Sequence, residues 1–150
     1  MKMKLVMLFV MVLLCGKANA QLKGDFFIIE TKPEYPGGIN EMFKFLGSHL
    51  NTPKSTLAKK VFGVVYIGFT VDTAGQILEP QIKKRELKRV ETTHGLMGKK
   101  SVEIPIDGDL DWENECLRVI KLMPKWKPST QQGRPIFFKY TLPIETKRHD

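Results

Sequence analysis

Cysteine is scarce in this 150-residue sequence, which contains only Cys15 and Cys116. Because Cys15 lies in an apolar segment near the N-terminus that we expect to be removed, one cysteine remains for the folded part. An internal disulfide framework, the usual support of small secreted domains, is therefore excluded for the mature chain. The hydrophobic core must supply the stability, and Cys116 is expected to be a small buried hydrophobe.

Apolar runs long enough to cross a bilayer as a helix, roughly 20 residues, are also missing. The run at 5–15 follows two lysines and precedes the small residues at 18–20. This order is typical of a secretory signal peptide, so we predict cleavage before Gln21 and export of the mature chain. Two alternatives remain open: lipid attachment at Cys15, and retention of the segment as an uncleaved membrane anchor.

Motifs of catalysis and metal binding are missing as well. The sequence has no Gly-x-Ser-x-Gly turn, no phosphate-binding Gly-rich loop and no His-Glu-x-x-His helix. The three histidines lack the spacing of metal ligands. Asp107, Asp109 and Asp111 precede a predicted helix, where carboxylates stabilise the first amides of the helix. We therefore predict a protein that is not an enzyme, with no cofactor and no metal.

Acidic side chains are the minority, with 16 Asp and Glu against 24 Lys and Arg, for a net charge of +8. A basic balance can indicate nucleic-acid binding. Here export argues against a nucleic-acid partner, and acids are interspersed with the basic residues. The densest basic run, at 83–89, is expected to be a solvated surface.

Two stretches have the spacing of amphipathic helices. The apolar positions of the first are Ile39, Met42, Phe43, Leu46 and Leu50. Those of the second are Trp112, Cys116, Val119, Ile120 and Met123. The first ends at Asn51 and Pro53, whereas the second is capped by Asp109 or Asp111 and stops at Pro124.

Alternation with a period of two predicts three strands. The first spans 61–71, and the turn sequence at 72–76 returns the chain antiparallel through 77–87, a strand that Pro80 weakens. The last spans 134–144. Residues 90–108 are expected to form an extended loop or a small accessory hairpin. The fold class is therefore α+β, a three-stranded antiparallel sheet with two helices packed on one face.

An edge strand of such a sheet has unpaired backbone donors and acceptors. The last strand is rich in Phe and Tyr and has few charges, so it is poorly protected. It is suited to recruit an extended peptide by strand addition. The alternative is a non-catalytic envelope interaction protein that homodimerises through this edge strand.

The motifs PEYPGG, FGVVYIGFTVDTAGQI and LDWENECLRVIKLMPKWKPSTQQGRPIFFKYTLPI occur in this order, with an amphipathic helix after the first. This arrangement resembles the C-terminal domain of TonB in the form common in Bacteroidetes-type envelopes, over about residues 33–144. The resemblance implies a TonB-like domain at 33–146. It follows a signal peptide at 1–20 and an N-terminal extension at 21–32, and it precedes a short tail at 147–150.

The resemblance further implies a periplasmic domain that binds the TonB box of outer-membrane active transporters as a strand added beside 134–144, contributing to energy-coupled transport. By position it assigns peptide binding to Tyr35, Pro36, Arg134, Ile136, Phe137, Phe138, Lys139, Tyr140 and Thr141. A complete TonB has a membrane helix, which engages an inner-membrane motor complex, and a long linker before this domain. Here the predicted signal peptide is followed almost at once by the domain, so engagement of the motor complex stays open. Trp126, between Pro124 and Pro128, is expected to pack against the sheet or a helix end.

Overall fold

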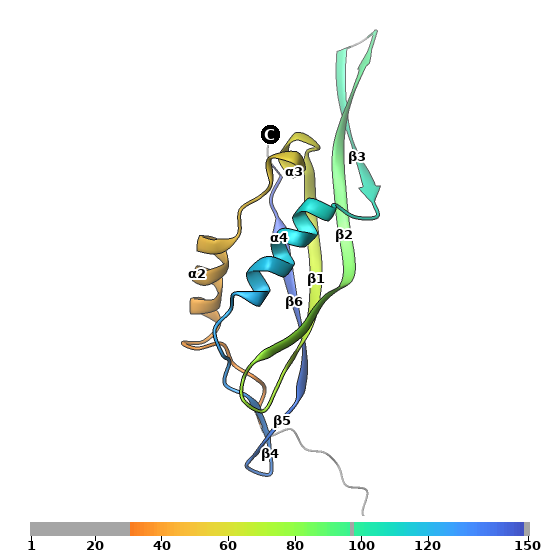
Figure 1. The fold of residues 1–150 in the computed structure, drawn as a ribbon. Helices are drawn as coiled ribbons and strands as arrows, with labels where there is room; N and C mark the ends of the chain where they lie inside the picture. Colours follow the sequence, from red (N-terminus) through yellow and green to blue (C-terminus); the bar gives the residue numbers. More distant parts are fainter. Residues whose placement is uncertain (1–30, 97, 149–150) are drawn as a thin grey trace, which may run out of the picture.

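The computed structural model describes residues 31–148 apart from residue 97 (Figure 1). The predicted signal peptide, nearly all of the N-terminal extension and the last two residues lie outside this range. The described elements are α2 (Ile39–His49), α3 (Lys54–Ala58), β1 (Val61–Val71), β2 (Ile77–Gly95), β3 (Gly98–Ile106), α4 (Leu110–Lys121), β4 (Ser129–Gln131), β5 (Arg134–Ile136) and β6 (Phe138–Thr146). The architecture is α+β, as predicted.

The main sheet has four antiparallel strands in the order β3-β2-β1-β6, so the predicted number of three is wrong. The extra strand, β3, comes from the segment expected to be a loop or hairpin. β2 pairs with β1 only as far as Arg89, whereas it pairs with β3 from Leu87 to Gly95. The ends of β2 and β3 therefore project beyond the sheet as a two-stranded arm (Figure 1).

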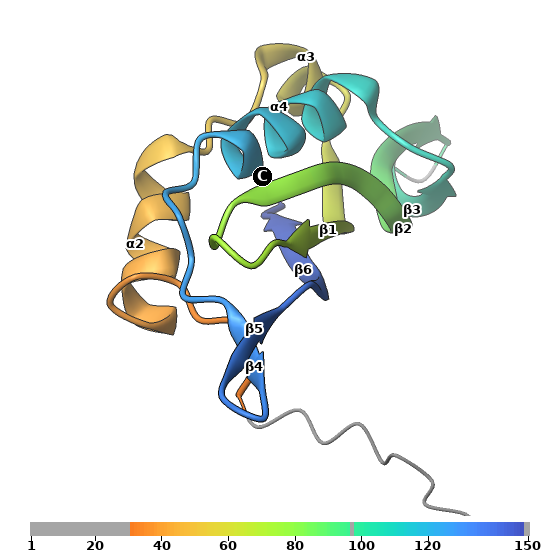
Figure 2. The same cartoon turned by 60° about the horizontal axis from the view of Figure 1, so that its bottom comes forward.

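One face of the sheet is buried under the helices. On β1 the side chains of Val65, Ile67, Phe69 and Val71 are buried, as their spacing predicted. They join one core cluster with Met42 of α2 and with buried residues of α4, so both helices pack on the same face. Figure 2 shows α4 crossing this face and α2 beside it.

Helix α4 follows the sequence prediction closely. Asp109 is its N-cap, and its Oδ1 accepts a hydrogen bond from the Trp112 amide at 3.0 Å. The predicted apolar face is buried along its whole length. Helix α2 departs from its prediction, because Ile39 and Phe43 are 59% and 57% exposed although both were placed on the apolar face.

The predicted last strand at 134–144 is broken at Phe137, so a continuous strand there is wrong. Residues 134–136 form β5, which pairs with β4 in a separate two-stranded hairpin. The hairpin turn is made by Gln132 and Gly133, whose φ values of 50° and 69° suit a tight two-residue turn. Pairing with β4 thus removes 134–136 from the main sheet, and the edge strand begins at Phe138.

Strand β2 contains two irregularities that bend it. Its register with β1 shifts by one residue at Lys83 and again at the pair Glu79 and Pro80. Pro80 cannot donate a ladder hydrogen bond, so a bulge is a position where it is tolerated. The strand curves strongly as a result (Figure 2).

Candidate functional site

The strand β6 forms one edge of the main sheet. It pairs with β1 in an unbroken register of nine residue pairs, from Gly63 opposite Thr146 to Val71 opposite Phe138. On its other side, no strand of the described part of the chain pairs with it. The backbone groups on that side therefore face outward without a ladder partner.

The side chains of β6 alternate between the two faces of the sheet. Leu142 and Ile144 are buried under the helices, and Tyr140 packs against the same core. Lys139 and Thr141 lie on the opposite, helix-free face and are exposed. A strand added beside β6 would meet an aromatic and apolar surface on one side and a polar surface on the other.

Trp126 organises the aromatic side of this edge. It is 4% exposed, and its ring makes edge contacts with the rings of Tyr35, Phe69 and Tyr140 at centroid distances of 5.8, 5.5 and 5.1 Å. Its backbone N–H donates to the carbonyl of Gly75 at 2.8 Å, which ties it to the β1–β2 turn. The predicted packing role of this tryptophan is confirmed.

A hollow of about 280 Å³ lies where this cluster meets α2. Tyr35, Trp126 and Tyr140 line it together with Ile39, an exposed residue of α2. Burial, with a smaller contribution from Glu41, raises the pKa of the Tyr35 hydroxyl, so this side chain stays neutral at physiological pH. One acid, Glu34, also lines the hollow, whose other side chains are aromatic or apolar.

The residues assigned to peptide binding fall into four places. Tyr35 and Tyr140 meet at the aromatic cluster, while Phe138, Lys139 and Thr141 follow the free edge. Three others lie on the β4–β5 hairpin or at its junction with β6, namely Arg134, Ile136 and Phe137. Pro36 lines a different recess, beside Phe45 and His49.

Sequence reasoning did not include Ile39 and Phe43 in the site, because their helical spacing assigned them to the core. Both side chains are exposed, and Ile39 lines the hollow together with Tyr140 of β6. Part of the apolar stripe of α2 therefore has no covering element among the described residues. The only available signal was the position of Ile39 at the start of α2, directly after the Gly37-Gly38 turn.

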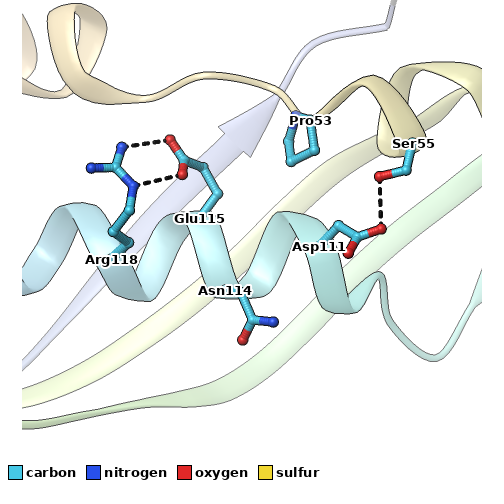
Figure 3. A pocket seen from close by; sticks show the side chains of 6 residues that line it. All are labelled: Pro53, Ser55, Asp111, Asn114, Glu115 and Arg118. Atoms are coloured by element: carbon cyan, nitrogen blue, oxygen red, sulfur yellow. Dashed lines mark hydrogen bonds and ion pairs between the residues drawn. The ribbon is translucent and has the colours of Figure 1, made fainter.

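A separate recess of about 300 Å³ lies between α3 and α4 (Figure 3). Its polar groups bind one another: the Arg118 guanidinium contacts Glu115 at 2.8 Å, and the Ser55 hydroxyl donates to Asp111 at 2.7 Å. The hydrogen bond from Arg118 lowers the pKa of Glu115. The Ser55–Asp111 bond joins α3 to α4. Arg118 and Glu115 both lie on α4, and they bind the His49 carbonyl at the end of α2 and the Asn51 amide just after it. The polar groups of this recess are thus engaged in contacts within the fold.

Reactive groups are few in the described residues. No three His, Cys, Asp or Glu side chains between 31 and 148, residue 97 aside, gather where they could hold a metal ion. Burial raises the pKa of the Cys116 thiol to about 12, which leaves it protonated and inert. None of the described helices is long and apolar enough to cross a membrane.

No protein-family profile, curated protein or solved structure matches this chain. The features that bear on function are therefore the β6 edge, the aromatic cluster and the charged groups around them.

Proposed function

We propose that this protein binds an extended peptide by strand addition at the free edge of β6. The resemblance to the TonB C-terminal domain gives the peptide an identity, the TonB box of an outer-membrane transporter, and gives the location as the periplasm. The observation that carries the proposal is the edge itself. It has a row of unpaired backbone groups, and the hollow formed by Tyr35, Trp126 and Tyr140 lies directly beside it.

The single proline of β6 indicates which backbone groups a peptide would meet. Pro143 lies opposite Tyr66 of β1. Because proline has no N–H to donate to the ladder, its nitrogen is expected to face away from β1, toward the free edge. Backbone direction alternates along a strand, so Lys139, Thr141 and Glu145 also direct their N–H and C=O groups outward. Binding would therefore depend on the amides of Lys139, Thr141 and Glu145.

The exposed residues of α2 extend the apolar surface that borders the hollow. Ile39 borders the hollow, and Phe43 lies one helical turn further along. Alternate side chains of an added strand would face this surface. Backbone hydrogen bonds would then supply affinity, and the hollow would fix the register.

Thr141→Pro tests the proposal, since it removes an outward N–H while leaving the amides that face β1 in place. A hydrogen bond contributes about 0.5–1.5 kcal/mol net, so the affinity for a labelled TonB-box peptide should fall by roughly 2- to 13-fold in fluorescence anisotropy. Thr141→Val is the matched control. It changes the side chain, retains the N–H and should bind as the parent protein does.

A measurement on the unmodified protein makes the test independent of folding in the proline variant. Adding peptide should shift the NMR amide signals of Lys139, Thr141 and Glu145 more than those of Leu142 and Ile144. Equal affinity of the Thr141→Pro and Thr141→Val variants, or amide shifts confined to another surface, would contradict strand addition at β6.

The same edge supports a second candidate, homodimerisation through β6. Two copies of an unpaired edge strand can add to one another, and Phe137, 63% exposed at the start of the edge, would be covered by such a contact. Light scattering over a dilution series separates the two functions. A tight dimer that ignores peptide supports the second candidate, and a monomer that binds peptide excludes it.

A further inference from the structure

The helix-free face of the sheet has a hollow of about 430 Å³ next to the β6 edge. It lies over Gly68 of β1, which has no side chain to fill the space. Lys83 of β2 borders the hollow on one side, and Lys139 and Thr141 of β6 border it on the other. In the strand register, Thr141 lies opposite Gly68.

The position of Lys83 follows from the bend in β2. This residue is the extra one at the register shift between Tyr66 and Ile67. Its methylene chain lies flat on Gly68, because a Cβ on that glycine would come within 2.6 Å of Lys83 Cγ and 2.7 Å of its Cε. A bulge often redirects a side chain in this way near a binding surface.

The charges around this hollow are not neutralised by close partners. Among the described residues, neither Lys83 nor Lys139 makes an ion pair, whereas Lys84 next to Lys83 pairs with Glu86. One acid, Glu79, also lines the hollow. Two ammonium groups against one carboxylate leave a local excess of positive charge beside an unpaired strand edge.

We propose that this hollow makes the β6 edge selective for peptides with Asp or Glu on the helix-free face, an inference that rests on strand addition at β6. Neighbouring strands lie about 4.8 Å apart, so a side chain on that face would lie directly beside Lys139 and Thr141. A carboxylate there meets the Lys139 ammonium and faces the hollow that Lys83 borders. The opposite positions of the same peptide face Tyr140 and Ile39, which favour apolar groups.

The experiment uses a short fluorescein-labelled peptide of alternating threonine and valine, in which one Glu or one Gln is scanned along the sequence. The parent protein should bind a Glu peptide more tightly than the matching Gln peptide only when the scanned residue occupies one of the alternate positions that face the helix-free side. Exposed charge pairs are worth roughly 2- to 5-fold in affinity for each lysine at physiological salt. The scan therefore identifies which peptide positions face the hollow.

Lys83→Gln combined with Lys139→Gln should remove the preference for Glu, so that the Glu and Gln peptides bind this variant equally. Lys99→Gln combined with Lys100→Gln is the matched control, because it removes the same charge from the β2–β3 arm. This control should retain the preference. Glu79→Gln should strengthen binding of the Glu peptide by about 2- to 5-fold.

Each outcome decides one of the two proposals. If Glu and Gln peptides bind the parent protein equally at every position, the selectivity is wrong and strand addition stands. Loss of the preference in the Lys99 and Lys100 control as well would show a general effect of net charge and would overturn the role of the hollow. If no peptide binds and none shifts the β6 amides, the proposed function itself fails.

Discussion

The contact between Gly75 and Trp126 makes a sharp prediction about stability. Gly75 lies in the β1–β2 turn with φ 80°, and its carbonyl accepts the Trp126 N–H at 2.8 Å. A Cβ at this position would overlap the carbonyl oxygen of Trp126. Gly75→Ala must therefore strain the turn and also push the Trp126 backbone away.

The cost has two parts. A left-handed conformation costs a non-glycine residue about 1–2 kcal/mol, and loss of the backbone hydrogen bond adds about 0.5–1.5 kcal/mol. Gly133→Ala is a matched control, because Gly133 also has a positive φ, 69°, but an added Cβ has nothing within 4 Å. We expect Gly75→Ala to lower the free energy of unfolding by about 1.5–3.5 kcal/mol and Gly133→Ala by about 1–2 kcal/mol.

Urea unfolding followed by tryptophan fluorescence measures both variants, and the difference between their unfolding free energies is the quantity to compare. Gly75→Ala should also weaken peptide binding, because Trp126 shapes the hollow beside β6. Equal destabilisation by the two substitutions would refute the reasoning. It would show that the chain relaxes around the new methyl group without loss of the Trp126 contact.

The remaining predictions concern two buried groups. Burial opposes ionisation of Asp109, yet hydrogen bonds from Trp112, Lys59 and Thr56 lower its pKa. The ionised carboxylate of Asp109 should thus stabilise the fold above its unfolded pKa, about 4. This stabilisation should be lost as the pH falls through the pKa of the folded state. Asp109→Asn should abolish this part of the acid dependence. At neutral pH that substitution should cost about 1–3 kcal/mol in urea unfolding. Cys116, with its pKa at about 12, should resist a thiol reagent at about pH 8 until the protein unfolds.

The buried half of the fold was predictable from the sequence. The apolar residues from Trp112 to Met123, on α4 and just after it, recur with a helical period because they pack against the core. The core side of β1 alternates with a period of two for the same reason. The role of Trp126 also followed, since two prolines isolate an aromatic residue that has to be covered. In these segments the local pattern and the tertiary packing agree.

The exposed half was less predictable, for physical reasons. Both sides of the β2–β3 arm are solvated, so Thr92, Thr93 and their neighbours show no alternation of burial that could reveal a strand. The break at Phe137 depends on pairing between β4 and β5, a contact that no periodicity encodes. The exposure of Phe43 likewise depends on tertiary packing, because its helical spacing is that of a core residue.

The register between β6 and β1 has a mechanical consequence. Tension along β6 loads its nine residue pairs in shear, so they resist together, whereas tension across the strand would open them one after another. Resistance to such a pull is a property of the unfolding rate, not of the equilibrium stability. A ligand aligned with β6 that is pulled along the strand would thus load all nine pairs at once.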